Sequence, residues 1–226
     1  MLARLLEKIV VKNYLYPIIT TGDKFSDQFA FRPRGSTTGA LTCLMHKITG
    51  MLESCRFIRC LLIDFSKCFD TVDRSILLTK LTKFNIHPFI IRWISSLLSD
   101  RSQAVCVNGQ LSDYSSINLG VIQGSGIGPS LFTILASDLH PIHTSNALVK
   151  FADDMTLASP EGSDIDIKEE FENIKLWAEN NNLHINMLKT KEMVFVRPSP
   201  YPPLIPSPLA QIERIAAGKL LGVIFQ

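Results

Sequence analysis

The sequence has little net charge and no long apolar run, and each absence excludes a class of protein. Lys and Arg number 23 against 21 Asp and Glu, which leaves a formal net charge of +2. So small an excess creates no strong overall field for nucleic acid, so any basic binding surface must be local. No uninterrupted apolar stretch reaches the ~18 residues of a membrane span, and we expect no membrane partner.

Cysteine and histidine are also scarce, with five of each, and neither shows the spacing of metal ligands. An odd number of cysteines argues against a complete disulfide framework, and we expect no secretory signal peptide. We therefore expect an intracellular, reducing setting and read these cysteines and histidines as ordinary core or surface residues.

The chain does have ample material for a core, since 46% of its 226 residues are hydrophobic. That amount suits one sizeable core with a smaller appended lobe. Apolar spacing and capping residues predict helices at 2–19 (stopped by Pro17), from Ser36 or Thr37, from Asp73, from Pro88 to about 98, from Pro129, and at 165–181. Strands are predicted at 57–65, at 103–107 paired with 116–119, in a hairpin at 147–159, and at 191–196 and 219–225. This order, with a stiff proline-rich linker at 198–208, predicts an α+β fold with an antiparallel sheet.

The most informative feature is the run Phe151-Ala152-Asp153-Asp154 between two apolar stretches. Adjacent carboxylates repel one another, and they persist most easily where a cation neutralises them. Asp64 ends the apolar run at 57–65, and neighbouring strands lie about 4.8 Å apart. The three acids are therefore candidates for a two-metal site of phosphoryl transfer. The alternative is a solvated Asp-Asp turn and a separate strand-end cap, because aspartate favours turns.

Taken together, the motifs resemble the reverse transcriptase of non-LTR retrotransposons of the LINE or jockey type. The matching stretches follow the order of that family. They are residues 28–38 (QFAFRPRGSTT, fingers motif), 64–72 (DFSKCFDTV, motif A), 120–129 (GVIQGSGIGP, motif B), 151–154 (FADD, motif C), 183–186 with 189–190 (LHIN and KT, motif D) and 220–223 (LLGV, motif E). The resemblance implies a polymerase palm, with helices packed on one face of the sheet.

The same resemblance assigns catalytic and metal-binding roles to Asp64, Asp153 and Asp154, with Asp154 contributing least. The cofactor it implies is a pair of Mg²⁺ ions, for which Mn²⁺ can substitute. Lys189 matches a lysine proposed to protonate the departing pyrophosphate, which is general-acid work. Lys191 is two residues away and is an alternative proton donor, and a plain surface lysine is the usual role of either.

Nucleotide contacts are implied for four further residues. Phe69 matches the aromatic gate that excludes a 2′-hydroxyl, and Phe65 lies close to it; the alternative for both is ordinary core packing. Gln123 and Gly124 match the loop that lies against the nascent base pair, where glycine lets the backbone approach closely. The alternative there is a tight strand-to-helix loop without a ligand.

Arg32 and Arg34 precede a predicted helix start, and guanidinium groups in such a place suit phosphate oxygens. The resemblance assigns this region to template binding, and the alternative is a solvated basic turn.

By resemblance, residues 1–56 are partial fingers, 57–197 the palm, and 198–226 a linker with the motif E strand. An earlier fingers strand and a thumb are expected in the family and are not recognised here, so we expect a truncated fragment of a retrotransposon polyprotein. Its partners would be an RNA template, a DNA primer and deoxynucleoside triphosphates, and the resemblance implies a nuclear location.

The first hypothesis is therefore an RNA-directed DNA polymerase domain that adds deoxynucleotides to a primer 3′-hydroxyl. A second is a catalytically silent remnant that binds nucleic acid or a protein partner. A third, a metal-dependent nuclease or phosphatase, lacks histidine or glutamate partners at suggestive spacing from the acids.

Overall fold

The computed structural model describes residues 2–21 and 23–226, so Met1 and Gly22, both within the predicted fingers segment, lie outside the described residues. The chain passes back and forth between two units. Unit 1 comprises residues 1–22 and 67–137, and unit 2 comprises residues 23–66 and 138–226. These units are defined by internal contacts, whereas the division into fingers, palm and motif E segment is functional and stays a prediction. No helix among the described residues is both long enough and apolar enough to cross a bilayer.

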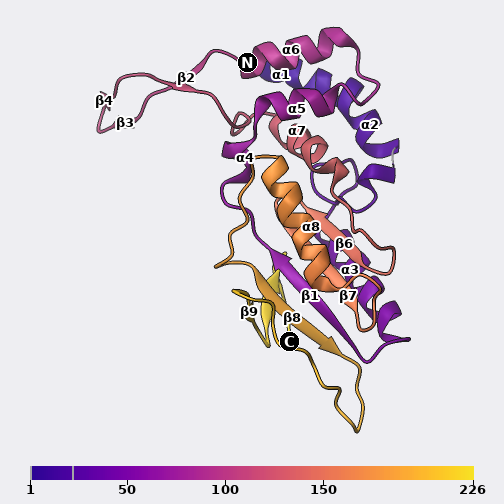
Figure 1. Ribbon diagram of the computed structural model, residues 1–226. Coiled ribbons are helices and arrows are strands. Elements are labelled where there is room, and N and C mark those ends of the chain that lie inside the picture. Colours follow the sequence, from indigo (N-terminus) through magenta and orange to yellow (C-terminus); the bar gives the residue numbers. More distant parts are fainter. Residues whose placement is uncertain (1, 22) are drawn as a thin grey trace. The chain divides into compact units, whose positions relative to one another are not determined.

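Unit 2 is built on a sheet of five strands in the order β6-β7-β1-β8-β9 (Figure 1). The strands are β1 (Phe57–Ile63), β6 (Ala147–Phe151), β7 (Asp154–Pro160), β8 (Lys191–Val196) and β9 (Glu213–Arg214). Neighbours among them are antiparallel except β8 and β9. Leu61 of β1 lies opposite Leu157 on one side and Glu192 on the other. The predicted strand at 57–65, the hairpin and the strand at 191–196 are confirmed, whereas the short β9 was not predicted.

Two long helices of unit 2 begin where side-chain caps were available. In α3 (Thr37–Leu52), the Ser36 hydroxyl accepts a hydrogen bond from the Gly39 N–H at 3.0 Å. In α8 (Ile167–Asn180), an Asp166 carboxylate oxygen accepts from the N–H groups of the second and third helical residues. Such caps satisfy amide groups that have no partner within the helix. The predicted starts near Ser36 and at 165 are therefore confirmed to within two residues.

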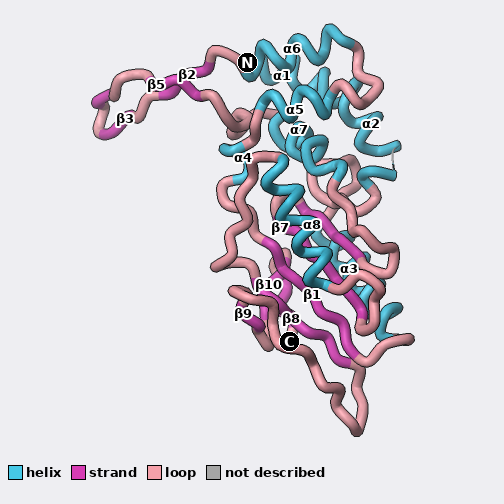
Figure 2. The backbone as a smooth tube through the Cα atoms, in the orientation of Figure 1, coloured by secondary structure: helices cyan, strands magenta, loops and turns pink. Residues whose placement is uncertain are grey.

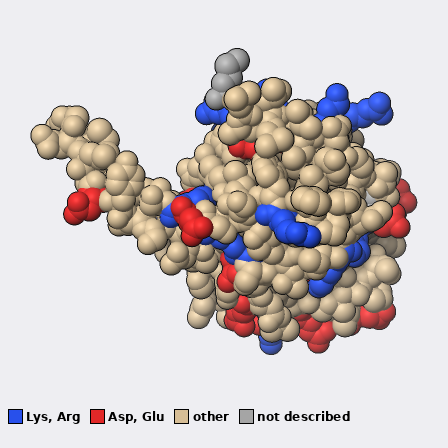
Figure 3. Space-filling view, turned by 90° about the horizontal axis from the view of Figure 1, so that it is seen from above, with Lys and Arg blue, Asp and Glu red and all other residues tan. Residues whose placement is uncertain are grey.

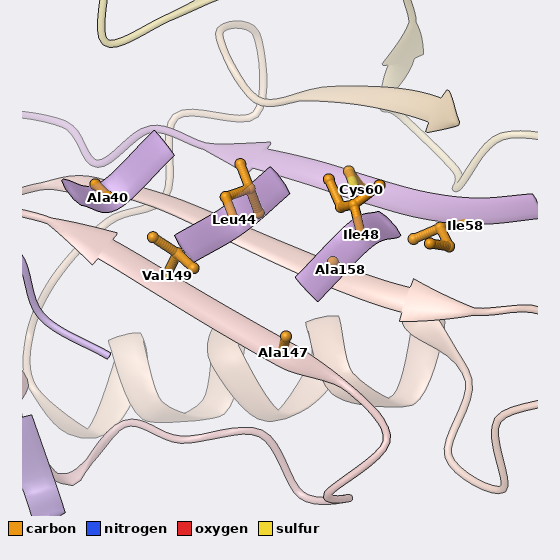
Figure 4. Close-up of a cluster of buried hydrophobic side chains, with 8 residues drawn as sticks. All are labelled: Ala40, Leu44, Ile48, Ile58, Cys60, Ala147, Val149 and Ala158. Carbon is orange, nitrogen blue, oxygen red and sulfur yellow. The ribbon is translucent and has the colours of Figure 1, made fainter. Parts of the chain in front are cut away.

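The two helices cover opposite faces of the sheet. Figure 4 shows α3 contributing to a cluster made of Ala40, Leu44, Ile48, Ile58, Cys60, Ala147, Val149 and Ala158. Side chains of alternate parity, such as Leu61 and Leu157, are also buried and point away from α3. In Figure 1, α8 lies in front of the strands and α3 behind them. The α+β class is confirmed, but helices on both faces replace the single covered face we expected, because the central strands are apolar on both sides.

The C-terminal part of unit 2 contains a hairpin where one strand was predicted. Strands β10 (Gly218–Leu220) and β11 (Val223–Phe225) pair across Leu221 and Gly222, whose φ angles are +48° and +91°. Two consecutive positive φ angles make the tight turn that reverses a chain between paired strands. The prediction of a single strand at 219–225 was therefore wrong. Residues 198–208 are all described and contain no helix or strand, as predicted.

Unit 1 is mostly helical (Figure 2). Its helices are α1 (Leu2–Val10), the π-helical turn η1 (Val11–Leu15), α2 (Tyr16–Thr21), α4 (Cys68–Thr71), α5 (Arg74–Leu81), α6 (Pro88–Leu98) and α7 (Gly128–Leu135), which leads into the 3₁₀ turn η3 (Ala136–Asp138). The expected stop at Pro17 was wrong. Pro17 lies in the first turn of α2, where its missing N–H is tolerated, so helical structure continues to Thr21. The starts predicted at Asp73 and Pro88 are confirmed, and Pro129 is the second residue of α7.

A β-ribbon extends from the helices of unit 1. It contains β2 (Arg101–Gln103) paired with β5 (Ser115–Ile117), and β3 (Cys106–Val107) paired with β4 (Gln110–Leu111). The predicted turn at Asn108-Gly109 is confirmed, but the prediction of one continuous pair of strands was wrong, because the ribbon contains two separate short pairs. The Ser112 hydroxyl accepts the Val105 N–H at 2.9 Å in place of a backbone carbonyl, while the Ser112 N–H still donates to the Val105 carbonyl at 2.9 Å. Figure 3 shows the ribbon almost free of charged residues.

Candidate active site

The strand register of unit 2 brings two of the predicted acids to neighbouring positions. Ile63 of β1 pairs with Met155 of β7. Asp64 directly follows Ile63, and Asp154 directly precedes Met155, so the antiparallel ladder carries both carboxylates at the same end of adjacent strands. Asp153 lies one residue earlier, in the turn between β6 and β7. The register therefore places the backbones of Asp64 and Asp154 at neighbouring positions, with Asp153 in the adjoining turn, and the convergence of the three carboxylates stays a prediction.

The backbone of Asp64 is held on both sides by the segment that follows α8. Its N–H donates to the Thr190 hydroxyl at 3.3 Å, and its carbonyl accepts the Asn186 N–H at 2.8 Å. Thr190 is fully buried. Motif D therefore positions motif A directly, a role for Thr190 that sequence reasoning missed because buried threonines in apolar surroundings carry no distinctive pattern.

The electrostatics of the acids reflect their proximity. The pKa of Asp154 is raised above its ordinary value, first by loss of surrounding solvent, although its side chain is exposed, and then by the negative charges of Asp153 and Asp64. Lys189 is exposed, and its Nζ lies 3.9 Å from Asp64 Oδ2. A hollow of about 300 Å³ is lined by Asp64, Asp154, Lys189, Lys191, Gly218 and Lys219, among others. The site is thus an acidic strand end that opens onto a hollow with basic side chains.

The two candidate lysines differ in their partners. Lys191 Nζ donates to the Glu213 carboxylate at 2.8 Å and to the Leu188 carbonyl at 2.7 Å. Lys189 Nζ instead approaches Asp64. The geometry therefore favours Lys189 over Lys191 as the lysine that acts at the acids.

Carboxylate oxygens are the ligands that hard divalent cations prefer, so the donor chemistry of Asp64, Asp153 and Asp154 fits such an ion. Among the described residues, no three His, Cys, Asp or Glu side chains are already arranged to hold a metal. Like charges resist convergence until a cation neutralises them. The assignment of the three acids as metal ligands stays a prediction.

Three other predicted site residues lie in unit 2. Phe65 is 4% exposed and packs edge-to-face on Trp177, with ring centroids 6.2 Å apart, which is a core contact. Arg32 Nη1 donates to the carbonyls of Phe25 and Gln28 at 2.6 and 3.0 Å, so part of its guanidinium holds its own loop. Arg34 is exposed. Template contact by the two arginines stays a prediction.

The remaining predicted residues lie in unit 1. The ring of Phe69 is 4.7 Å from that of Phe132 of α7, and Gln123 Nε2 donates to Asp70 Oδ1 at 2.7 Å. Gly124 has a φ of +74° and open space where a Cβ would lie. Motifs A and B are thus joined within this unit, as the Val121 N–H also donates to the Phe69 carbonyl at 2.9 Å.

Comparison with known proteins gives matches that cover most of the chain. The family model described as reverse transcriptase (RNA-dependent DNA polymerase) matches residues 1–225. The RNA-directed DNA polymerase from mobile element jockey of Drosophila melanogaster is 27% identical over 206 residues, covering 86% of this chain and 22% of the relative. The probable RNA-directed DNA polymerase from transposon X-element of the same species is 23% identical, covering 99% and 25%.

The chain therefore spans about a quarter of the length of these curated relatives. Among solved structures, telomerase from Candida tropicalis with a TWJ fragment of telomeric RNA is similar, with a TM-score of 0.63 at 14% identity over 86% of this chain and 34% of that one. Likeness at that identity shows the fold alone.

Proposed function

The chain belongs to the reverse transcriptase (RNA-dependent DNA polymerase) family, and on that premise we propose that it carries the nucleotidyl-transfer site of a non-LTR retrotransposon protein. The observation that supports this most directly is the register that brings Asp64 beside Asp154, with Asp153 in the adjoining turn. The reaction would extend a DNA primer along an RNA template with deoxynucleoside triphosphates.

Asp64, Asp153 and Asp154 are the residues that would hold the divalent cations on which this family depends. When bound, two Mg²⁺ ions, or Mn²⁺ in their place, would lower the pKa of the primer 3′-hydroxyl and stabilise the leaving pyrophosphate. The contribution of the chain is to hold the acids in place. Thr190 and Asn186 restrain the backbone of Asp64, so the carboxylate is presented from a rigid strand end.

Lys189 is proposed as the proton donor to the departing pyrophosphate. Its ammonium lies 3.9 Å from Asp64, and 70% of its side chain is exposed, so it can reach a group bound in the hollow. Lys191 is engaged by Glu213 and is the weaker candidate.

For substrate contacts, Phe69 is proposed to exclude the 2′-hydroxyl, and Gln123 and Gly124 to lie against the nascent base pair. Asp70 orients the Gln123 amide, which supports a positioned rather than a freely rotating side chain. Phe65 supports the nucleotide site from the core, and Arg32 and Arg34 are proposed to bind the template strand. A nuclear site of action follows from the family resemblance alone.

Primer extension on the purified chain, with Mg²⁺ or Mn²⁺, tests the proposal. Extension is expected, and Asp153→Asn should lower it by at least about 1,000-fold, because the acid would be lost as a ligand while the fold is kept. Template binding by this variant should change less than about twofold, since phosphate contacts supply most of that affinity.

Asp164→Asn is the matched control, because Asp164 is an exposed acid of the same unit that pairs with His143. It should extend primers like the wild type. Full activity in Asp153→Asn would contradict the metal assignment. Absence of extension by a folded wild-type chain would favour the second hypothesis, a silent remnant that binds nucleic acid or a protein partner.

A further inference from the structure

The turn that carries Asp153 contains a conformation that its own sequence disfavours. Ala152 has a φ of +58° and is 7% exposed. A non-glycine residue is disfavoured in this left-handed region because its Cβ approaches the following carbonyl oxygen. Such a conformation persists only when surrounding groups hold it. The position of Asp153 therefore depends on contacts made by its neighbour.

Gln28 makes one of those contacts from a distant part of the sequence. Its side-chain Oε1 accepts the Ala152 N–H at 3.3 Å and also the Ala30 N–H at 2.9 Å. Gln28 is 1% exposed, so these bonds form away from competing water. One buried amide oxygen thus joins the loop of the fingers motif to the acidic turn.

Gln28 is itself held against β6. The Phe29 N–H donates to the Lys150 carbonyl at 2.8 Å, and the Lys150 N–H donates to the Asp27 carbonyl at 2.7 Å. The buried Lys150 ammonium adds an ion pair with Asp27 at 3.0 Å and donates to the Leu139 carbonyl at 2.9 Å. The anchor is therefore rigid, because residues 27–29 are fixed to β6 by both backbone and side-chain bonds.

We propose that Gln28 is a positioning residue that sets the Asp153-Asp154 turn for cation binding. The inference rests on the proposed function, since it assigns a support to the same acids. The role argued for Gln28 requires no contact with substrate or ion. It acts through Ala152, whose N–H it accepts, and the next residue along the chain is Asp153. Removal of the amide oxygen frees Ala152 to leave the left-handed region and displaces the carboxylate.

The test measures Mn²⁺ binding by the full chain, followed as loss of the electron paramagnetic resonance signal of free Mn²⁺. Gln28→Met keeps the length of the side chain and removes the acceptor. It should weaken Mn²⁺ binding about 10-fold or more, the range seen when supports of ligating carboxylates are lost. Gln28→Asn keeps an amide but is one methylene shorter, so the same loss is expected, and it serves if the methionine variant fails to fold.

Asn146→Leu controls for a general loss of stability. Asn146 is 5% exposed and lies just before β6, at the end opposite the acidic turn, where its Nδ2 donates to Ile165 and Glu170. This variant should lower the melting temperature and leave Mn²⁺ affinity unchanged. Equal affinities in Gln28→Met, Gln28→Asn and the wild type, or an equal loss in Asn146→Leu, would overturn the role of Gln28.

The Asp153→Asn variant distinguishes failure of the positioning role of Gln28 from failure of the proposed cation site. If the wild type and Asp153→Asn bind Mn²⁺ alike, the acids are not the cation site and both proposals fail. If Asp153→Asn loses affinity and Gln28→Met does not, only the positioning role of Gln28 fails.

Discussion

At the scale of single residues, the acidic turn places like charges side by side, and Asp154 has a shifted pKa. Its pKa is raised by loss of solvent and by the charges of Asp153 and Asp64. When folding raises the pKa of a carboxyl group, ionisation of that group lowers the free energy of unfolding. Without a cation, this penalty is absent well below the ordinary pKa of 3.8, grows as the pH rises from there to the higher folded-state pKa, and is fully present above it.

Asp154→Asn should therefore stabilise the cation-free chain at pH 7 and have almost no effect near about pH 3, where the carboxyl is protonated in both the folded and the unfolded state. The expected rise in melting temperature is on the order of 1–3 °C, because the exposed carboxylate is partly screened by solvent. Circular dichroism melts in EDTA at both pH values measure it. Asp113→Asn, which removes an exposed acid of the ribbon, is the matched control, and its melting temperature at pH 7 should stay close to that of the wild type. A destabilised Asp154→Asn at pH 7 would contradict the argument.

At the scale of elements, a buried carboxylate joins β1, β8 and β9. Glu192 Oε1 accepts from Arg59 Nε at 2.6 Å and from Arg214 Nη2 at 2.9 Å, and its Oε2 accepts the Leu209 N–H at 3.2 Å. The side chain has no exposed surface. The strand after the proline-rich linker is thus attached to the sheet by charge as well as by its short parallel ladder.

Glu192→Gln should lower the free energy of unfolding by about 3 kcal/mol, since it leaves two guanidinium groups without their buried counter-charge. Urea unfolding measures the change. Glu161→Gln is the matched control, because Glu161 pairs with Arg56 at the surface, where 68% of the Arg56 side chain is exposed. That variant should cost less than about 1 kcal/mol. Equal costs for the two variants would show that burial does not govern these pairs.

At the scale of the whole molecule, each unit is made from two separate stretches of sequence. The central strand β1 belongs to the earlier stretch of unit 2, yet both of its neighbours, β7 and β8, come after residue 138. Folding of this unit therefore requires pairing between segments roughly a hundred residues apart, as the register of Leu61 with Leu157 and Glu192 illustrates.

A fragment ending at residue 137 contains all the residues of unit 1 but leaves β1 and α3 without their partners. It should expose apolar surface, bind a hydrophobic dye and lack a cooperative unfolding transition from unit 2. The full chain should unfold cooperatively under the same conditions. Native-like protection of the β1 amides in the fragment, measured by hydrogen exchange, would contradict this expectation.

Most helices and strands could be predicted because capping residues and apolar spacing lie within or next to the element that they indicate. Ser36, Asp73 and Pro88 mark helix starts that the structure confirms. Patterns failed where a distant or subtle contact decides the outcome. In the ribbon, the Ser112 hydroxyl replaces a backbone carbonyl as the acceptor of the Val105 N–H, and Leu221 and Gly222 turn an expected strand into a hairpin. The loop at Gln28 was recognised as a motif, but its contact with Ala152 spans 124 positions and leaves no local trace.

By itself, the sequence determined the family and the order of the motifs and named the three acids as candidates, because these depend on residue types and their spacing along the chain. Only the tertiary structure decided that Asp64 and Asp154 occupy neighbouring strand ends, that Lys189 rather than Lys191 approaches them, and that Gln28 supports their turn. Strand register and long-range hydrogen bonds set these relations. Both arise from the packing of segments that are far apart in the sequence.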